Sequence, residues 1–299
     1  MRTSAFVPLA VLPLLLVSMD GSASISRAYA TEAGTTRQFT NAILKGDYAI
    51  ADIGHGGQAP QAGISVATYD GAGAFSGVTI QNLPGQTLQE RAFVRAPFTG
   101  TYTVNPDGTG NGTITVTLPG GSQDQATTAL VITRTAMVDG AEVAEEFSFM
   151  HEQLGSATGN LITLTAKRRP DGGRFTTASL RGDYAYTLIG EGSRIPQAGL
   201  GIMIYDGEGS FSGSATVNLP GVTFSERRFA TAPFVRPYAV NPDGTGTATP
   251  PGESDIAFVI TQADLVGDMK VAKEVFFIVR ELNPITGTLL TGVITKRSD

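Results

Sequence analysis

Apolar and polar residues alternate with a period of two through most of this chain, and that pattern predicts β-strands. Tyr184, Tyr186 and Leu188 share one face of such a segment, and Tyr48 and Ile50 share a face of another. Clusters of Gly, Asp, Asn and Pro separate the runs at intervals of about 8–15 residues, as turns separate antiparallel strands. No long segment has the spacing of an amphipathic helix. The pattern therefore predicts an all-β protein.

The pattern occurs twice along the chain. Residues 39–110 align without a gap with residues 175–246, with 41 identities in 72 positions. Further on, the offset falls from 136 to 128, so the second copy is eight residues shorter. Each copy has the size of a domain. We therefore expect two domains, residues 39–168 and 175–299, joined by a linker at 169–174, and we expect each to fold alone.

Each copy contains about eight strands. An antiparallel meander of that many strands usually closes into a barrel or folds as a sandwich. We favour two tandem eight-stranded, lipocalin-like barrels, because a barrel of that size is filled by side chains or holds one small ligand. The sandwich remains the alternative.

The stretch NPDGTG ends the gapless part of both copies, at Asn105–Gly110 and Asn241–Gly246. Asn, Pro, Asp and Gly in this order are typical of a type I turn followed by a glycine bulge. We expect a hairpin turn in which Gly108 and Gly244 take positive φ angles.

Residues 1–30 stand outside the repeat and have the features of a secretory signal peptide: a charged start, an apolar run and small residues ending at Ala30. Cleavage after Ala23 is the alternative. A membrane anchor is disfavoured, because the apolar run is short and contains two prolines. The sequence thus predicts a periplasmic or secreted protein with no transmembrane segment after the signal is removed.

The blocks LKGDYA, YDG.G.FSG and Y.VNPDGTG resemble those of a group of exported bacterial proteins, over most of both copies. The resemblance implies an all-β fold and a signal peptide, and it carries no catalytic residues. The predicted barrels are also similar in architecture to lipocalin-type and allene oxide cyclase-type barrels, a likeness of fold from which no function follows.

Charge and composition exclude several classes of protein. The net charge is −6, and no basic cluster is present, which argues against nucleic acid as a partner. There is no cysteine, hence no disulfide. In the alignment of the two copies, the two histidines, His55 and His151, correspond to Glu191 and Val279, so neither is duplicated. We therefore predict no cofactor, no metal and no catalytic residue, although His151 follows Phe147 and Phe149 on a face that could point inward.

The YDG loops raise the question of calcium, because aspartates and backbone carbonyls in glycine-rich loops are ligands of that ion. Each loop offers only one or two carboxylates. A DG pair at a strand end is foremost a hairpin signal. We interpret both loops as turns.

The candidate ligand-binding residues come from a charged pair present in both copies, Glu90-Arg91 and Glu226-Arg227. Each arginine shares a face with a phenylalanine two positions later, and if that face points inward the arginine needs a carboxylate or a ligand anion. A structural ion pair, or an outward face with Phe93 between the copies, is the alternative. The candidates are Arg91, Phe93, Tyr48, Arg227, Phe229 and Tyr184, with Ile64 and Leu200 against the apolar body of the ligand.

These observations favour an exported binding or interaction protein that holds a small amphipathic molecule in each barrel. An isomerase or cyclase that works in a barrel cavity is the alternative. A single outer-membrane barrel is disfavoured by the polar C-terminal end and the scarcity of aromatic girdles. The sequence does not specify the oligomeric state.

Overall fold

The computed structural model describes residues 38–57, 59–84, 90–155, 158–191, 196–220, 226–249, 255–283 and 287–298. The predicted signal peptide and both of its candidate cleavage sites lie outside these residues. Residues 37–299 form one compact unit. In the described part of the chain, no helix is long and apolar enough to cross a bilayer.

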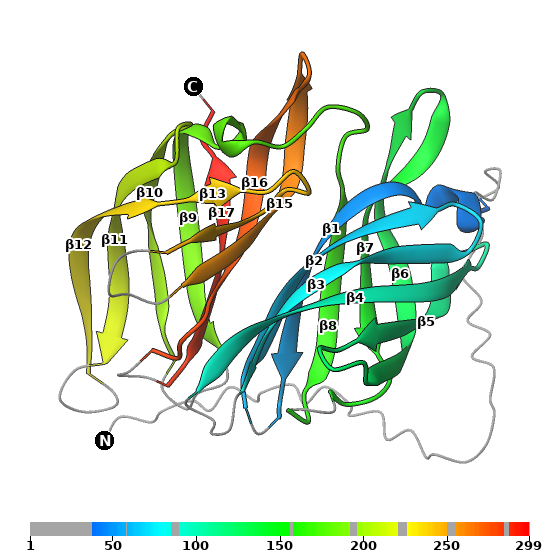
Figure 1. The fold of residues 1–299 in the computed structure, drawn as a ribbon, viewed down its shortest axis with the longest axis horizontal. Helices are drawn as coiled ribbons and strands as arrows, with labels where there is room; N and C mark the ends of the chain where they lie inside the picture. Colours follow the sequence, from blue (N-terminus) through cyan, green and yellow to red (C-terminus); the bar gives the residue numbers. More distant parts are fainter. Residues whose placement is uncertain are drawn as a thin grey trace, which may run out of the picture. The chain divides into compact units, whose positions relative to one another are not determined.

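The first copy is a closed barrel of eight antiparallel strands, in which β8 pairs back onto β1 (Figure 1). A short 3-10 helix, η1 (Asn41–Ile43), precedes it. The strands are β1 (Lys45–His55), β2 (Gln61–Asp70), β3 (Ala74–Pro84), β4 (Arg91–Val104), β5 (Thr109–Thr117), β6 (Gln123–Val138), β7 (Ala141–His151) and β8 (Leu161–Arg168).

The second copy is a curled nine-stranded antiparallel sheet that follows the 3-10 helix η2 (Thr177–Ser179). Its order is β12-β11-β10-β9-β17-β16-β15-β14-β13. The strands are β9 (Arg181–Glu191), β10 (Ala198–Asp206), β11 (Ser210–Pro220), β12 (Arg227–Pro237), β13 (Ala239–Val240), β14 (Thr245–Ala248), β15 (Ile256–Val266), β16 (Met269–Val279) and β17 (Leu289–Lys296). The predicted all-β fold is confirmed, and the first copy closes as predicted.

The second sheet stays open because the eight missing residues fall in the hairpin that closes the first barrel. In the first copy, Phe98–Val104 of β4 pairs with Gly110–Val116 of β5. The counterpart of β5, β14, has only four residues, and it pairs with β15 on one side and with the two residues of β13 on the other. The sequence continues from β14 as Thr249-Pro250-Pro251, and proline cannot donate to a β-ladder. The long edge of β12 is therefore left without the partner that β4 has.

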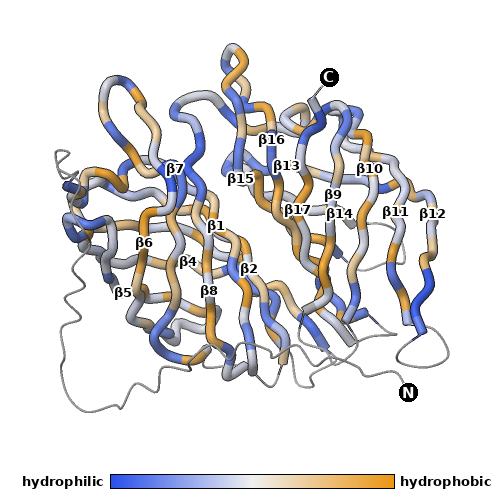
Figure 2. The backbone as a smooth tube through the Cα atoms, turned by 180° about the vertical axis from the view of Figure 1, so that it is seen from behind, coloured by the Kyte–Doolittle hydropathy of each residue, from blue (hydrophilic) through white to orange (hydrophobic). Residues whose placement is uncertain are grey.

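Both interiors are built on buried aromatic rings, as the alternation predicts. The Tyr48 hydroxyl donates to the Ala144 carbonyl oxygen at 2.8 Å, and the Tyr184 hydroxyl donates to that of Ala272 at 3.0 Å. Figure 2 shows apolar and polar positions alternating along the strands around these cores. The two tyrosines are fully buried, and each ties its own strand to the next strand but one, β1 to β7 and β9 to β16.

The repeated NPDGTG stretch is a hairpin turn in both copies. Gly108 has a φ of 86° and Gly244 a φ of 79°, as predicted. The Asp107 carboxylate accepts hydrogen bonds from the backbone N–H and the hydroxyl of Thr109, at 2.9 and 2.6 Å. The aspartate therefore holds the turn closed.

The YDG loops are also held by their aspartates. One carboxylate oxygen of Asp70 accepts hydrogen bonds from the backbone N–H groups of Ala72, Gly73 and Ala74, at 2.7 to 3.0 Å. Asp206 makes the same three bonds in the second copy. These bonds lower the pKa of both carboxyl groups. The loops are turns closed by their own side chains.

The outer surface of the first barrel packs against the outer surface of the second sheet. Ile64 and Val66 of β2 form a buried apolar cluster with Val259 of β15 and Phe276 and Ile278 of β16. Beside this cluster, the Lys167 ammonium donates to both oxygens of the Glu274 carboxylate, at 2.7 and 2.9 Å. Strand β2 is consequently buried on both of its faces.

Candidate functional site

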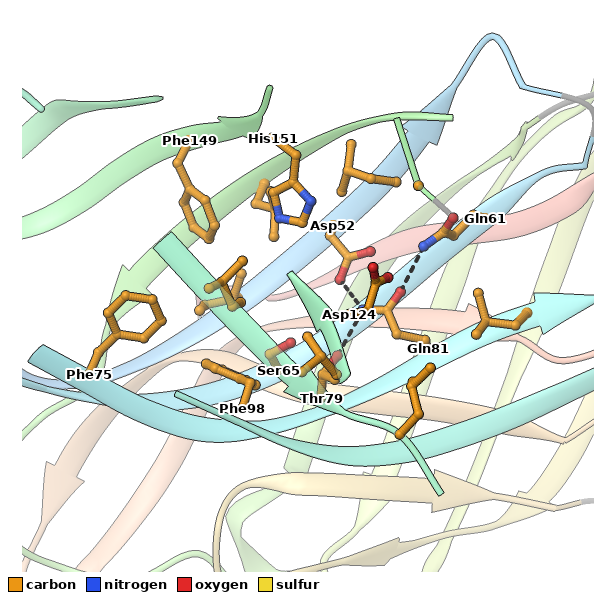
Figure 3. A pocket seen from close by; sticks show the side chains of 18 of the residues that line it. Asp52, Gln61, Ser65, Phe75, Thr79, Gln81, Phe98, Asp124, Phe149 and His151 are labelled. Carbon is orange, nitrogen blue, oxygen red and sulfur yellow. Dashed lines mark hydrogen bonds between the residues drawn. The ribbon is translucent and has the colours of Figure 1, made fainter. Parts of the chain in front are cut away.

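A cavity of about 130 Å³ lies inside the first barrel, at the end where the β1–β2, β3–β4, β5–β6 and β7–β8 connections are (Figure 3). Its deep walls are aliphatic and aromatic. Polar side chains gather on one part of the lining. They are Asp52, Gln61, Ser65, Thr79, Gln81, Asp124 and His151.

A glycine brings two of these polar side chains together. Asp52 of β1 stands opposite Gly63 of β2, and Gly63 stands opposite Gln81 of β3, so the three form one row across the inner face. Because Gly63 has no side chain, Gln81 Nε2 reaches over it and donates to Asp52 Oδ2 at 2.8 Å. A Cβ atom at Gly63 would overlap both groups.

Hydrogen bonds along the lining fix the orientation of Gln81. Its Nε2 also donates to Thr79 Oγ1 at 2.7 Å, and its Oε1 accepts from Gln61 Nε2 at 3.3 Å. Gln61 Oε1 in turn accepts from the Thr158 hydroxyl at 2.5 Å. The polar part of the lining is thus a connected network.

The carboxyl group of Asp52 is buried in the cavity wall, and its pKa is shifted. Asp52 is 1% exposed, and burial raises the pKa of its carboxyl group to about 7, although the hydrogen bond from Gln81 acts in the opposite direction. Its second oxygen, Oδ1, has no hydrogen-bond partner among the described residues. Burial disfavours the charged carboxylate. At neutral pH the carboxyl group is therefore poised between its two forms.

His151 is the second group with an unpartnered atom. It lies on the inner face of β7 with Phe147 and Phe149, as the alternation suggested. Its Nε2 is buried and makes no hydrogen bond within the described part of the chain. Burial lowers the pKa of the imidazole, and the carboxylate of Asp124 opposes that shift. The ring is therefore neutral at physiological pH and can offer a donor or an acceptor.

The second copy repeats Gln61 of this polar set, as Gln197, but not its main acidic, amide and imidazole groups. Leu188 stands where the first copy has Asp52, Ala215 where it has Thr79, and Val217 where it has Gln81. His151 is matched by Val279. Since the aromatic cores are repeated and the polar lining is not, the lining is a special feature of the first barrel.

The arginines proposed as ligand-binding residues are bound to the protein itself. Arg91 donates from Nε to the Asn82 side chain at 2.8 Å and from Nη2 to the carbonyls of Pro60 and Asn82, at 2.6 and 2.9 Å. Arg227 makes the same three bonds to Asn218 and Pro196. Burial lowers the pKa of Arg91 to about 10.

Arg91 also serves the contact between the copies. The amide nitrogen of Asn82, held in place by Arg91, donates to the carbonyls of Val279 and Arg280 at 2.8 Å each. Arg91 does not line the cavity of the first barrel. Ligand binding by the two arginines stays a prediction, and the described geometry gives them a structural role.

The other candidates are spread over three environments. Tyr48 and Tyr184 belong to the two buried cores. Phe93 packs on the apolar cluster between the copies, whereas its counterpart Phe229 is 76% exposed. The expectation that Ile64 shares a ligand-facing surface with Tyr48 is wrong, because Ile64 pairs with Ala51 and faces outward to the second copy.

Sequence reasoning missed Asp52, Gln81 and Thr79, although a signal was present. Asp52 follows Tyr48 and Ile50 on the inward face of the same strand, where the second copy has Leu188. A polar residue at a position that is apolar in the duplicate indicates a local need for polarity. Comparing differences between the copies, rather than identities, would have found the cavity.

Comparison with known proteins adds no further constraint: no protein-family model matches the chain, and the search of curated proteins gave no significant match.

Proposed function

We propose that the first barrel is the ligand-binding module of an exported protein and holds one small, largely apolar molecule that carries a hydroxyl group. The observation that supports this most is that two buried atoms of the cavity lining, Asp52 Oδ1 and His151 Nε2, are unpartnered among the described residues, opposite aliphatic and aromatic walls. Leaving a buried polar group unpaired costs about 1–3 kcal/mol. A hydroxyl group on a ligand would supply the missing hydrogen bonds.

The size of the cavity limits the ligand. A cavity of about 150 Å³ is enough to hold benzene, and this one is about 130 Å³. A phenol-sized molecule, or the head of a longer amphipathic one whose tail lies in the barrel mouth, fits that limit. Export rests on the predicted signal peptide.

The alternative, an isomerase or cyclase, is favoured by one observation. A carboxyl group with a pKa near 7 lines the same cavity as a neutral imidazole, and enzymes tune acid–base groups toward neutrality in this way. Binding without turnover is our first proposal, because the second copy keeps the fold and lacks this pair.

NMR titration of the mature chain with phenol, and with benzene as the ligand without a hydroxyl, tests the proposal. We expect phenol to bind in the first barrel about tenfold more tightly, which corresponds to about 1.4 kcal/mol. The variants Asp52→Leu and His151→Val carry the residues of the second copy and should lose the preference for phenol.

His55→Glu is the matched control, since it also introduces the residue of the second copy but lies outside the cavity. It should bind phenol as the wild type does. Equal affinities for phenol and benzene in the wild type would refute the proposal.

A further inference from the structure

The contact between the two copies joins unlike surfaces. We call the outer face of the first, second and fourth strands of a copy, together with the end of its last strand at the position of Lys167, its front face, and the remaining outer face of its last three strands its back face. The front face of the first copy packs on the back face of the second. Its members are Ala49, Ile53, Ala62, Ile64, Val66 and Phe93, and those of the second copy's back face are Ala257, Val259, Phe276, Ile278 and Leu289.

Because the chain is a duplication, the same two surfaces exist a second time and are unused. The counterparts of Ile64, Val66 and Phe93 on the second copy are Leu200, Ile202 and Phe229. These three side chains are 60%, 45% and 76% exposed. Strand β10 thus presents a row of large apolar side chains to solvent, which a monomeric protein rarely does.

The back face of the first copy is left free in the same way. Val131, Met150 and Leu161 stand where the second copy has Val259, Ile278 and Leu289. The second-copy residues are fully buried, whereas those of the first copy are 44%, 50% and 39% exposed. Apart from Ser148, which stands where the second copy has Phe276, a similar apolar surface is therefore covered in one copy and open in the other.

The polar anchor of the contact is also repeated. Arg227 holds Asn218 as Arg91 holds Asn82, whose amide nitrogen bonds to the opposite copy. The ion pair is not repeated, because Thr295 replaces Lys167 at the corresponding position. A contact made by the free faces would thus keep most of the apolar part and the asparagine, and it would lack the Phe276 ring and the salt bridge.

We propose that the free front face of the second copy binds the free back face of the first copy in another molecule of this chain. This contact between two chains would repeat the contact that the two copies already make within one chain. A contact between unlike faces is heterologous, so it produces rings where the rotation closes and open filaments where it does not.

Sedimentation velocity of the chain from Thr31 to Asp299, over a range of concentrations, tests this proposal. The wild type should form species at whole multiples of the chain mass, and added salt should not disperse them, since the contact lacks the ion pair. Leu200→Lys blocks the front face of the second copy, and Met150→Lys blocks the back face of the first. Each variant alone should be monomeric.

A mixture of these two variants is the decisive arm. Each variant keeps one intact face, so the mixture should form one-to-one dimers and nothing larger. Met137→Lys should assemble as the wild type does, because the counterpart of this exposed residue, Leu265, takes no part in the apolar cluster between the copies. Circular dichroism confirms that each variant is folded.

Three results would overturn the proposal: a wild type that stays monomeric at every concentration, a Met150→Lys variant that still dimerises through two front faces, or a mixture that stays monomeric. A monomeric wild type would mean that a different partner covers these faces.

Discussion

Gly63 has no side chain, and this allows Asp52 and Gln81 to meet on the inner wall of the first barrel. The corresponding glycine of the second copy, Gly199, lies beside Leu188 instead, and a Cβ atom there would be 3.1 Å from Leu188 Cγ. The same residue thus supports a polar contact in one copy and apolar packing in the other.

We expect Gly63→Ala to displace Gln81 and to weaken phenol binding several-fold, because a Cβ atom would occupy the space in which the amide meets the carboxylate. Gly199→Ala is the matched control, since a Cβ atom there would meet Leu188 and the Thr216 carbonyl at 3.1 Å in the second copy, away from the cavity, and it should leave binding unchanged. NMR titration of both variants measures this. Unaltered binding by Gly63→Ala would show that the Asp52–Gln81 contact does not matter to the site.

The raised pKa of Asp52 makes stability depend on pH. The folded state holds the proton up to about pH 7, whereas the unfolded chain releases it near 3.8, the ordinary pKa of an aspartate. The contribution of Asp52 is therefore complete below about pH 4 and is lost as pH rises toward 7. From pH 5 to pH 7 the loss is about 2–3 kcal/mol, since each pKa unit corresponds to about 1.4 kcal/mol.

Urea unfolding of the wild type and Asp52→Asn across this range measures the difference. The wild type should lose stability relative to the variant as pH rises from 5 to 7. Parallel pH curves would mean that the carboxyl group has an ordinary pKa.

At the scale of elements, the two NPDGTG turns differ in what surrounds them. A Cβ atom at Gly244 would lie 2.8 Å from Arg169 Nη1 and 2.9 Å from the Phe175 ring, whereas one at Gly108 would lie 3.1 Å from the Phe39 ring. The turn of the second copy is therefore the more crowded one.

We expect Gly108→Val and Gly244→Val each to cost about 1–2 kcal/mol or more, because a β-branched residue resists a positive φ. The loss should be larger at Gly244, where the space is smaller. Thermal and urea unfolding of both variants measure this. A larger loss at Gly108 would contradict the difference in packing.

The sequence predicted the strands, the turns and the duplication, because each depends on local pattern or on identity between the copies. It could not show which face of a strand points inward. Strand β2 is apolar on both faces, since one lines the barrel and the other packs on the second copy. The sequence pattern therefore could not show that Ile64 faces the second copy.

The sequence pattern also did not predict that the second sheet stays open. The sequence showed that the second copy lacks eight residues. Whether this loss opens the sheet depends on which residues of β4 pair with the hairpin in the first copy. Polar cavity residues such as Asp52 differ between the two copies, so they do not stand out among the residues that the copies share.

At the scale of the whole molecule, each copy has its own core, and a third cluster lies between them. We expect the fragments Phe39–Arg168 and Arg174–Asp299 each to fold into a β-rich unit, less stable than the same unit in the whole chain, because the cluster between them is then exposed. Mixed together, they should bind each other.

Circular dichroism with thermal melting of each fragment, and analytical ultracentrifugation of the mixture, measure this. Two unfolded fragments would show that the copies share one cooperative core. Folded fragments that do not bind each other would contradict the packing between the two copies.

The most direct test of the ligand-binding proposal is native mass spectrometry of the protein purified from its own host. We predict that the wild type retains one small molecule for each chain, not two, because only the first barrel carries the polar cavity. The double variant Asp52→Leu/His151→Val, purified in the same way, should retain none. A wild type without any retained molecule, or a molecule that stays bound to the double variant, would contradict ligand binding in this cavity.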